Sequence, residues 1–396
     1  NPNYIVAMAE RTFFSEWVLP IISEPIRDGY ISLADGKITA VGKQSDFAGD
    51  RKLAQDLGHS VVCPALVNAL FHPDYPVADP QTTSRGSFLN WLHSGKNASR
   101  VSSKLEVESE LLSAIKRGYD YGTAAIGIRT RHPEISQHLE HSGLYSVVFE
   151  MLHGFRDSNA FDIWTNRGRF SNTDLTRFHH AGEFLFNLGP EVFRLISRTD
   201  ERTALPLSFM KDEDIFFMKG QGRIYQYLLG KEDMDYRWQP PRTSPLKYFM
   251  NNAFAARETI LSQVIMLEED ELDLLKKRPE VFHMCLHPRF DRQWELGTAP
   301  GQLIQDKGFN ICLGTFAEHM DIRAEMRSAS AEYGFKPEEI IKMATLNGAK
   351  ALGLADKIGS IEVGKDAKVF SIPSTASISD PYHIILFTNE RLRQVS

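Results

Sequence analysis

Three histidines in this chain each follow a short apolar run that is typical of a buried strand, and imidazole nitrogen is a common metal ligand. They are His72 after "CPALVNALF", His153 after "VVFEML" and His287 after "HMCL". In the last run His283, Cys285 and His287 alternate, so their side chains share one face of a strand. If the strand ends meet, His72, His153 and His287 could bind a metal ion. The alternative for each one singly is a hydrogen-bonded polar group.

One acidic residue has the type and position to transfer protons. Glu213 lies in the charged run "KDED", directly after the apolar run "ALPLSFM". A carboxylate at the end of a strand can act as a general acid or base. The alternative is an ordinary acid in a solvated charged run. His72 and Asp74 could also form an imidazole–carboxylate pair, with or without a function.

Charge and composition narrow the class of protein. The chain has 396 residues and a net charge of −6 without a long basic run, so neither nucleic acid nor an anionic membrane surface is an expected partner. No apolar run approaches the roughly 18 residues that span a bilayer. The three cysteines are widely spaced in apolar runs. This pattern predicts buried free thiols and a cytoplasmic, reducing location.

Strands and helices alternate along most of the chain. Before Val61 the sequence reads as short strands and turns, with a hairpin signal at Asp35-Gly36. After it, apolar runs alternate with helical segments, which predicts a (β/α)8 TIM-like barrel. The expected strands are "SVVCPALVNA", "TAAIGIRT", "LYSVVFEMLH", "EFLFNLG", "ALPLSFM", "TILSQVIML", "VFHMCLHP" and "FNICLGT".

Both ends of the chain read differently from the middle. A helix is expected to begin at Pro337 and to end at Gly353, and the tail "IGSIEVGKDAKVFSIP" returns to turn-rich strand. We therefore expect two units. Residues 61–355 form the barrel, and residues 1–60 and 356–396 together form a small β-sandwich.

Several stretches resemble a known family. "DGYISLADGKITAVGK", "CPALVNALFH" and "MATLNGAKALGLADKIGSIEVGKDAKVFSI" are similar to the amidohydrolase superfamily. Within it the chain resembles the cytosine and guanine deaminases and the chlorohydrolases. "IISEPIRDGYI", "RGSFLNWLHSGKNASR" and "VVFEMLHGF" resemble the aminodeoxyfutalosine deaminases.

The resemblance implies a Zn²⁺ or Fe²⁺ site at the C-terminal mouth of the barrel. The positions where the family has metal ligands hold Leu70, His72, Met210, Gln263 and Phe316 in this chain. Leu70 and Phe316 have no lone pair, and the Met210 thioether suits Cu(I) rather than Zn²⁺. Only His72 keeps a standard ligand. We expect these side chains to cluster at the mouth as a pocket.

Other positions around this mouth follow from the same resemblance. Met266 stands where the family has a water-activating histidine, and Glu213 keeps the family's acid–base position, three residues after Met210. The segment from Pro73 to Ser103 carries Trp91 at helical spacing from Phe88, so it is expected to form a lid or ligand wall. The alternative is a helix packed on the barrel rim. His153, His287 and Trp91 are further pocket candidates.

The preferred interpretation is an amidohydrolase-fold protein with a degenerate metal centre and no cofactor. It would be a small-molecule-binding or regulatory pseudoenzyme rather than a standard metal-dependent hydrolase. An alternative is an active hydrolase or deaminase that acts on carbon–nitrogen bonds other than peptide bonds through an atypical site. Zn²⁺ or Fe²⁺ is expected only if the site moved to His72, His153 and His287. A further alternative is a structural subunit, either a homo-oligomer or a partner of an active paralogue.

Overall fold

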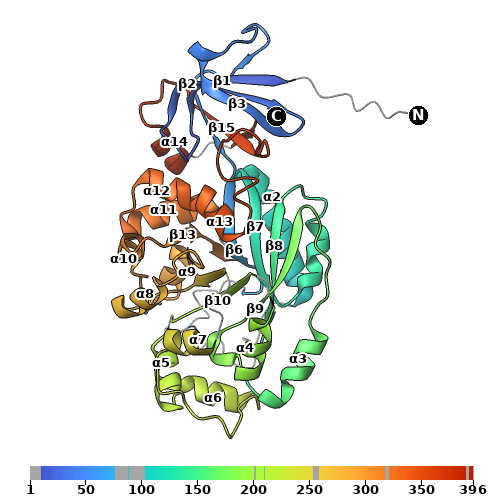
Figure 1. Cartoon of the computed structure of the whole chain (residues 1–396), viewed down its shortest axis with the longest axis vertical. Helices are drawn as coiled ribbons and strands as arrows, with labels where there is room; N and C mark the ends of the chain where they lie inside the picture. The colour runs from blue at the N-terminus through green and yellow to red at the C-terminus, as the bar shows by residue number, and fades with distance from the viewer. Residues whose placement is uncertain are drawn as a thin grey trace, which may run out of the picture.

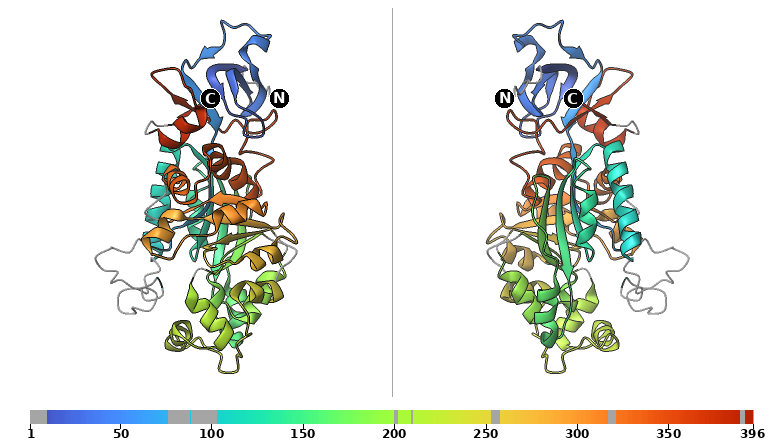
Figure 2. Two further views of the ribbon diagram at one scale, coloured as in Figure 1. Left: turned by 90° about the vertical axis from the view of Figure 1, so that its left-hand side faces the viewer. Right: turned by 90° about the vertical axis from the view of Figure 1, so that its right-hand side faces the viewer.

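The molecule has two parts, a sheet built from both chain ends and a larger body of parallel strands and helices. In the computed structural model the sheet lies at one end of the long axis and the body fills the other (Figures 1 and 2). The described residues are 10–75, 88, 103–199, 202–208, 210–252, 258–316, 321–388 and 392–395.

The sheet at the end, called here the terminal sheet, has seven strands in the order β16-β15-β5-β1-β2-β3, with β4 beside β1. Strand β15 pairs antiparallel with β5, so the C-terminal segment joins the same sheet as the N-terminal strands. These strands are β1 (Arg11–Val18), β2 (Ile26–Ala34), β3 (Lys37–Lys43), β4 (Gln55–Asp56), β5 (Ser60–Pro64), β15 (Val369–Pro373) and β16 (Arg393–Gln394).

The predicted hairpin is confirmed. Strands β2 and β3 are antiparallel, with Ala34 opposite Lys37. The two residues between them have positive φ, 49° at Asp35 and 73° at Gly36. This is the two-residue turn whose twist matches that of the strands.

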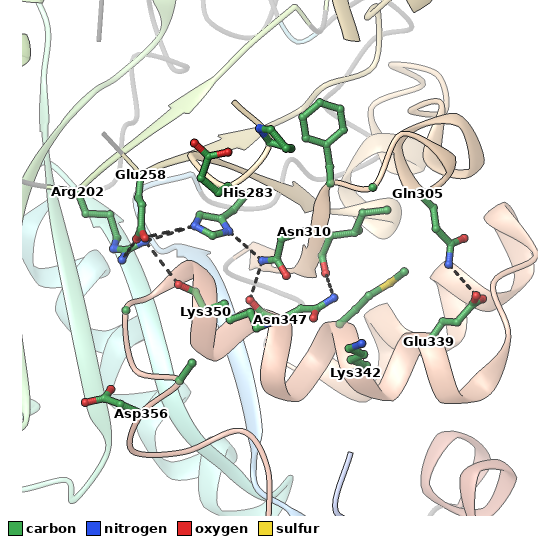
Figure 3. A pocket seen from close by; sticks show the side chains of 18 residues that line it. Arg202, Glu258, His283, Gln305, Asn310, Glu339, Lys342, Asn347, Lys350 and Asp356 are labelled. Atoms are coloured by element: carbon green, nitrogen blue, oxygen red, sulfur yellow. Dashed lines mark hydrogen bonds and ion pairs between the residues drawn. The ribbon is translucent and has the colours of Figure 1, made fainter. Parts of the chain in front are cut away.

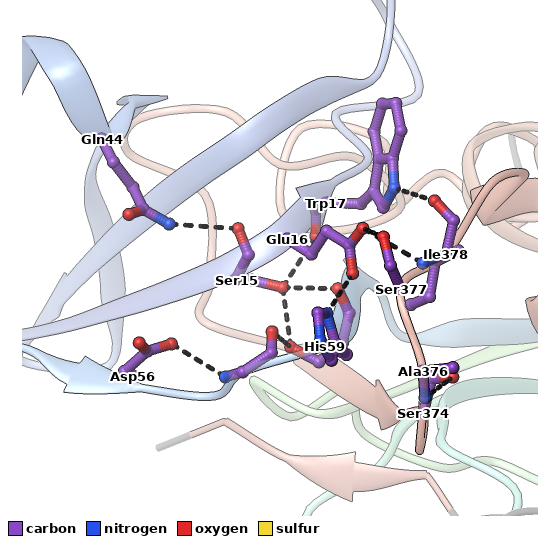
Figure 4. A network of polar contacts seen from close by, with 12 residues as sticks. Ser15, Glu16, Trp17, Gln44, Asp56, His59, Ser374, Ala376, Ser377 and Ile378 are labelled. Atoms are coloured by element: carbon purple, nitrogen blue, oxygen red, sulfur yellow. Dashed lines mark hydrogen bonds and ion pairs between the residues drawn. The ribbon is translucent and has the colours of Figure 1, made fainter.

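A polar network fastens the C-terminal segment to β1 (Figure 4). The Glu16 carboxylate accepts a hydrogen bond from the backbone N–H of Ile378 at 3.1 Å and lies 2.8 Å from Nδ1 of His59. Trp17 Nε1 donates to the carbonyl of Ile378 at 2.8 Å. Although burial alone raises the pKa of Glu16, hydrogen bonds from Ser377 and His59 lower it overall.

The body contains two groups of parallel strands, in the orders β14-β6-β7-β8-β9 and β10-β11-β12-β13. Gly314 alone separates β13 from β14, so β14 continues β13 and links the two groups. Strands β9 and β10 also lie side by side. The strands are β6 (Leu66–His72), β7 (Thr123–Thr130), β8 (Tyr145–Leu152), β9 (Thr176–Gly182), β10 (Thr203–Pro206), β11 (Thr259–Ser262), β12 (Phe282–Leu286), β13 (Asn310–Leu313) and β14 (Thr315–Phe316).

Helices cover these strands, and every residue of β6 and β7 is buried. Parallel strands with both faces covered have continuous apolar sequences of this kind. The helices are α2 (Lys104–Asp120), α3 (Ala160–Asn166), α4 (Pro190–Ser197), α5 (Lys211–Lys219), α6 (Arg223–Gly230), α7 (Pro245–Asn252), α8 (Glu269–Leu275), α9 (Pro288–Gln293), α10 (Gly301–Asp306), α11 (Ile322–Tyr333), α12 (Pro337–Lys342), α13 (Gly348–Ala351) and α14 (Pro381–Phe387). None of the helices in the described part of the chain combines the length and apolar character needed to cross a bilayer.

The helix expected from Pro337 to Gly353 is also confirmed, with one difference. A π-helical turn, Met343–Asn347, separates α12 from α13. Gly353 follows α13 with φ of 67°, the left-handed conformation that ends many helices.

Two strand predictions are wrong. The run "SVVCPALVNA" was expected to be the first barrel strand, but its first half is β5, which pairs with β1 and β15 in the terminal sheet, and only its second half lies in β6. The run "EFLFNLG" was expected to be the fourth strand, but β9 precedes it and pairs with β8 from Thr176 to Gly182. Residues 183–189 are fully buried and contain a 3₁₀ turn, Leu185–Asn187. The run is apolar because its side chains pack in the core, so its composition alone does not distinguish it from a strand.

Candidate functional site

The C-terminal ends of β6, β12 and β14 bring three rings together. Phe316 lies opposite His72 in the strand register, and the two rings stack with centroids 4.3 Å apart. The ring of His287, which follows β12, lies 5.2 Å from that of His72 and 5.1 Å from that of Phe316. In barrels with this topology the active site forms at these strand ends. We call this place the mouth.

His287 is hydrogen-bonded through both ring nitrogens. Nε2 lies 3.1 Å from the carbonyl oxygen of Leu70, and Nδ1 lies 3.1 Å from Nε2 of Gln263. Gln263 has a positive φ of 50°, which is uncommon for a residue with a side chain and is often found at functional sites. Burial lowers the pKa of His287 to about 4. Its imidazole is therefore neutral at neutral pH.

A fully buried arginine on β7 lies beside His72. Nη1 of Arg129 is 3.4 Å from Nδ1 of His72, and Nη2 donates to the carbonyl of Gly182 at 2.8 Å and to that of Glu183. Burial, together with the positive charge of Arg129 and the neighbouring His287, holds the pKa of His72 well below its ordinary value. His72 is thus also neutral.

The Glu183 carboxylate follows β9 and lies near Arg129, and it has several polar partners. It forms an ion pair with Arg131 and accepts hydrogen bonds from Tyr75 Oη at 2.9 Å and from Asn187 Nδ2 at 2.8 Å. Burial alone would raise the pKa of Glu183, but Arg131 and His153 lower it to about 2. The carboxylate is therefore ionised.

The proposed relocated metal site is not formed by the described residues. His72 and His287 are neighbours, but Nδ1 of His153 lies 3.9 Å from a Glu183 oxygen. His153 lies near the carboxylate because the buried charge of Glu183 is stabilised by polar or positively charged neighbours. The suggested pair of His72 and Asp74 is not seen either. Asp74 accepts the backbone N–H of Arg131 at 2.8 Å, and burial raises its pKa to about 6.

The other predicted residues have the following places. Met210 is buried and caps α5, where Glu213 Oε2 accepts the Met210 N–H at 3.1 Å. Met266 is half-buried, and its N–H donates to the carbonyl of Ser208 at 2.7 Å. Trp91 lies outside the described residues.

Aromatic rings cover the mouth. Phe290, on α9, stacks on Phe316 with ring centroids 3.6 Å apart. Phe88, from the expected lid, contacts Phe290 and Trp294 edge-on at 6.0 and 5.5 Å. Tyr75 lies 6.3 Å from Phe88. Tyr75 and Phe88 of this segment therefore pack over the mouth.

Sequence reasoning missed the charged part of this site. The signal was present in "TAAIGIRTRH", where two arginines end an otherwise apolar strand. A charge at the C-terminal end of a buried parallel strand lies where barrels place functional groups. The residues missed were Tyr75, Arg129, Arg131, Glu183 and Asn187.

The described residues do not fit a zinc ion. A catalytic zinc needs about three nitrogen, oxygen or sulfur ligands. In the described part of the chain, no three His, Cys, Asp or Glu side chains lie close enough together to hold a metal. Both nitrogens of His287 already have partners, and the Arg129 guanidinium places a positive charge next to His72.

A separate concave region lies at the opposite ends of the strands (Figure 3). This pocket, of about 920 Å³, is at the N-terminal ends of β10–β13. Its central polar groups satisfy one another: His283 Nδ1 accepts from Asn310 Nδ2 at 2.9 Å, and Arg202 pairs with Glu258. We therefore place the candidate site at the mouth, where His72 Nε2 and Arg129 Nε have no hydrogen-bond partner among the described residues.

Comparison with known proteins identifies the family. The profile of the Amidohydrolase family matches residues 240–387. A 5-methylthioadenosine/S-adenosylhomocysteine deaminase from Syntrophobacter fumaroxidans is 21% identical over 87% of this chain and 80% of that protein. The chain belongs to the amidohydrolase superfamily. A second deaminase with this name, from Halalkalibacterium halodurans, is 34% identical, but the match covers only 36% of this chain and 35% of that protein.

Solved structures of the superfamily share the fold. Helicobacter pylori aminofutalosine deaminase aligns with a TM-score of 0.81 and 16% identity over 97% of this chain and 98% of that one. An adenosine deaminase from Xanthomonas campestris with bound zinc aligns with a TM-score of 0.71 and 19% identity, over 96% of this chain and 90% of that one. The fold is thus an α/β fold of the TIM-barrel type.

Two expectations from the sequence are corrected by these comparisons. The preferred interpretation, a pseudoenzyme with a degenerate metal centre, is contradicted because relatives that match most of the chain are named as deaminases. The expectation of no cofactor is contradicted because members of this fold family, such as the Xanthomonas campestris enzyme, have zinc in their structures. The residues at the few metal-ligand positions suggested an inactive protein, whereas similarity over most of the chain indicates a deaminase relative.

Proposed function

We propose that this protein is a hydrolase that deaminates an adenosine-like nucleoside at the mouth. The observation that carries the proposal is the extent of the similarity: 5-methylthioadenosine/S-adenosylhomocysteine and 5'-deoxyadenosine deaminases match 87% and 88% of this chain. Two neutral histidines and a buried arginine at the strand ends also support the proposal, because barrels form their active sites there.

In the proposed reaction a water oxygen bonds to the ring carbon that carries the amino group. One proton of the water passes to the amino group, which leaves as ammonia, and the other passes to the adjacent ring nitrogen as the ring carbon becomes a carbonyl. We assign the proton transfer to Glu213, which is buried in the first turn of α5. A helix N-terminus stabilises an ionised carboxylate, so Glu213 can accept the proton. Because the described residues do not fit zinc, no step is assigned to a metal.

The proposal also includes the finer features of the fold. We propose that the body closes into a barrel of eight strands, through contact of β9 with β10 and of β14 with β6. We also propose that the terminal sheet folds over as a sandwich. The barrel would place Met210, Gln263 and Phe316 around one opening, with His72 and His287.

The test is a deaminase screen of the full chain, with ammonia release and the change in purine absorbance as two readouts. The substrates are adenosine, 5'-deoxyadenosine, 5'-methylthioadenosine and S-adenosylhomocysteine, each with and without added Zn²⁺. Elemental analysis of the same sample gives the metal content. We expect turnover of at least one nucleoside. Absence of turnover with all of them, in folded protein and with Zn²⁺ present, contradicts the proposal.

Two variants assign the chemistry. In Glu213→Gln the amide oxygen can still accept the Met210 N–H, so the cap of α5 is kept while the base is lost. We expect kcat to fall by at least about 100-fold, as for loss of a general base. His141→Gln changes an exposed histidine and is the matched control. An unchanged kcat in Glu213→Gln removes Glu213 from the mechanism.

A further inference from the structure

The contact between Arg129 and His72 determines which ring nitrogen of His72 carries the proton. A guanidinium has only hydrogen-bond donors. Nδ1 of His72, 3.4 Å from Nη1 of Arg129, must therefore be the acceptor. In a neutral imidazole the proton is then on Nε2. His72 consequently presents an N–H group, not a lone pair, on its other side.

His287 has the same tautomer for a different reason. The carbonyl of Leu70, 3.1 Å from Nε2, can only accept, and the amide nitrogen of Gln263, 3.1 Å from Nδ1, can only donate. Both the donor and the acceptor of His287 are thus used within the protein. It does not compete for the N–H of His72.

Two buried donors at the mouth remain without an acceptor. Nε2 of His72 and Nε of Arg129 have no hydrogen-bond partner in the part of the chain that the structure describes. Both side chains are buried, with exposed fractions of 0% and 1%. An unsatisfied buried donor is unfavourable, and one that belongs to a charged group is more so. The pair is therefore suited to a ligand that supplies acceptors.

The local charge specifies the kind of acceptor. Arg129 bonds to the backbone carbonyls of Gly182 and Glu183, and it forms no ion pair among the described residues. The Glu183 carboxylate is instead occupied by Arg131, Tyr75 and Asn187. Burial has the largest effect on Arg129 and lowers its pKa, although the charges of Glu183 and Asp74 act on it in the opposite direction. A guanidinium to which no carboxylate is directly bonded among the described residues, next to a neutral N–H donor, favours an anionic oxygen group.

We propose that Arg129 holds His72 as the Nε2–H tautomer and that the two side chains form a subsite for an anionic oxygen group, a carboxylate or a phosphate. Arg129 is a positioning residue for His72 and a binding residue for the anion. The tautomer and the anion subsite do not depend on the proposed function. Only the identification of the anion as part of a substrate rests on it. Under that function, the preferred nucleoside carries such a group.

A purely structural role of Arg129 has to be separated from this one. Its hydrogen bonds to the carbonyls after β9 cross-link β7 and β9, and they would stabilise the fold in any case. The experiment therefore measures the tautomer and anion binding, neither of which depends on turnover. Arg129→Lys keeps the charge, Arg129→Met removes it, and His72→Phe keeps the ring but loses the N–H. The control is Arg198→Met, which changes an exposed arginine.

The first readout is the ¹⁵N chemical shifts of the His72 ring in full-length protein. We expect a protonated Nε2 in the wild type, and a changed pattern in Arg129→Met. A protonated Nδ1 in the wild type overturns the proposal. This readout does not follow from a loss of stability alone.

The second readout is the melting temperature with inorganic phosphate, with acetate, or with chloride at equal ionic strength. The anion is added well before heating because aromatic rings cover the mouth. We expect phosphate or acetate to raise the Tm of the wild type and of Arg198→Met more than chloride does. The apparent affinity should fall at least about tenfold in Arg129→Met and His72→Phe. The oxyanion that stabilises more shows whether the group is a phosphate or a carboxylate.

An equal Tm increase in wild type, Arg129→Met and His72→Phe, or no increase in the wild type, overturns the subsite. If Arg129→Met does not fold, His72→Phe and Arg129→Lys carry the comparison. Oxyanion binding without turnover of any nucleoside would refute only the deaminase proposal. Turnover without oxyanion binding would refute only the subsite.

Discussion

Glu325, on the buried face of α11, allows a quantitative prediction about pH and stability. Its exposed fraction is 1%, and Oε2 accepts the backbone N–H of Arg289 at 3.2 Å. Burial raises the pKa of Glu325 from 4.5 to about 8. Burial and the neighbouring Glu325 also raise the pKa of Asp291 well above its ordinary value. At neutral pH Glu325 is therefore protonated in the folded state.

The unfolded chain releases this proton near pH 4.5, whereas the folded chain keeps it until about pH 8. Between these values the folded state binds more protons, so raising the pH favours unfolding. The loss is about 1.4 kcal/mol per pH unit, and over the whole interval it amounts to the order of 5 kcal/mol. Below pH 4.5 the stabilisation is fully present. Above pH 8 the loss is complete.

Glu325→Gln keeps the shape and the acceptor oxygen but removes the titration. We expect the variant to gain stability relative to the wild type as the pH rises from 5 to 8. The assay is urea unfolding at pH 5, 6, 7 and 8 for both proteins. The control is Glu338→Gln, on the exposed side of α12, which should track the wild type at every pH. A stability difference between Glu325→Gln and wild type that does not change with pH refutes the reasoning.

Three other perturbations have outcomes set by packing and contacts. In Gly127→Ala the added Cβ would lie 2.2 Å from the carbonyl oxygen of Ala69. We therefore expect the free energy of unfolding, measured in urea, to fall by about 1–3 kcal/mol. The control Gly230→Ala, with open space around the position, should be neutral or stabilising. Glu16→Gln removes the ionised acceptor of the C-terminal segment, and limited proteolysis should cut this variant after residue 373 faster than wild type. A thiol reagent should label no cysteine in the folded protein and three after unfolding, because all three are buried: Cys63, Cys285 and Cys312.

Features that depend on neighbouring residues could be predicted from the amino-acid sequence. The β2–β3 hairpin was predictable because Asp35 and Gly36 tolerate positive φ. The helical segment from Pro337 to Gly353 was predictable because proline begins and glycine ends a helix. The alternation of apolar runs with helices indicated parallel strands, since both faces of such strands are buried.

The tertiary structure alone decided which polar groups meet. His153 and His287 each follow a strand, but His153 is beside Glu183 while His287 is beside His72. "EFLFNLG" and a true strand have the same composition, and only the pairing of β8 with β9 distinguishes them. The partners of Arg129 come from β6 and from the end of β9, more than 50 residues away on either side. Local propensities carry no information about such contacts, because they depend on strand order and register.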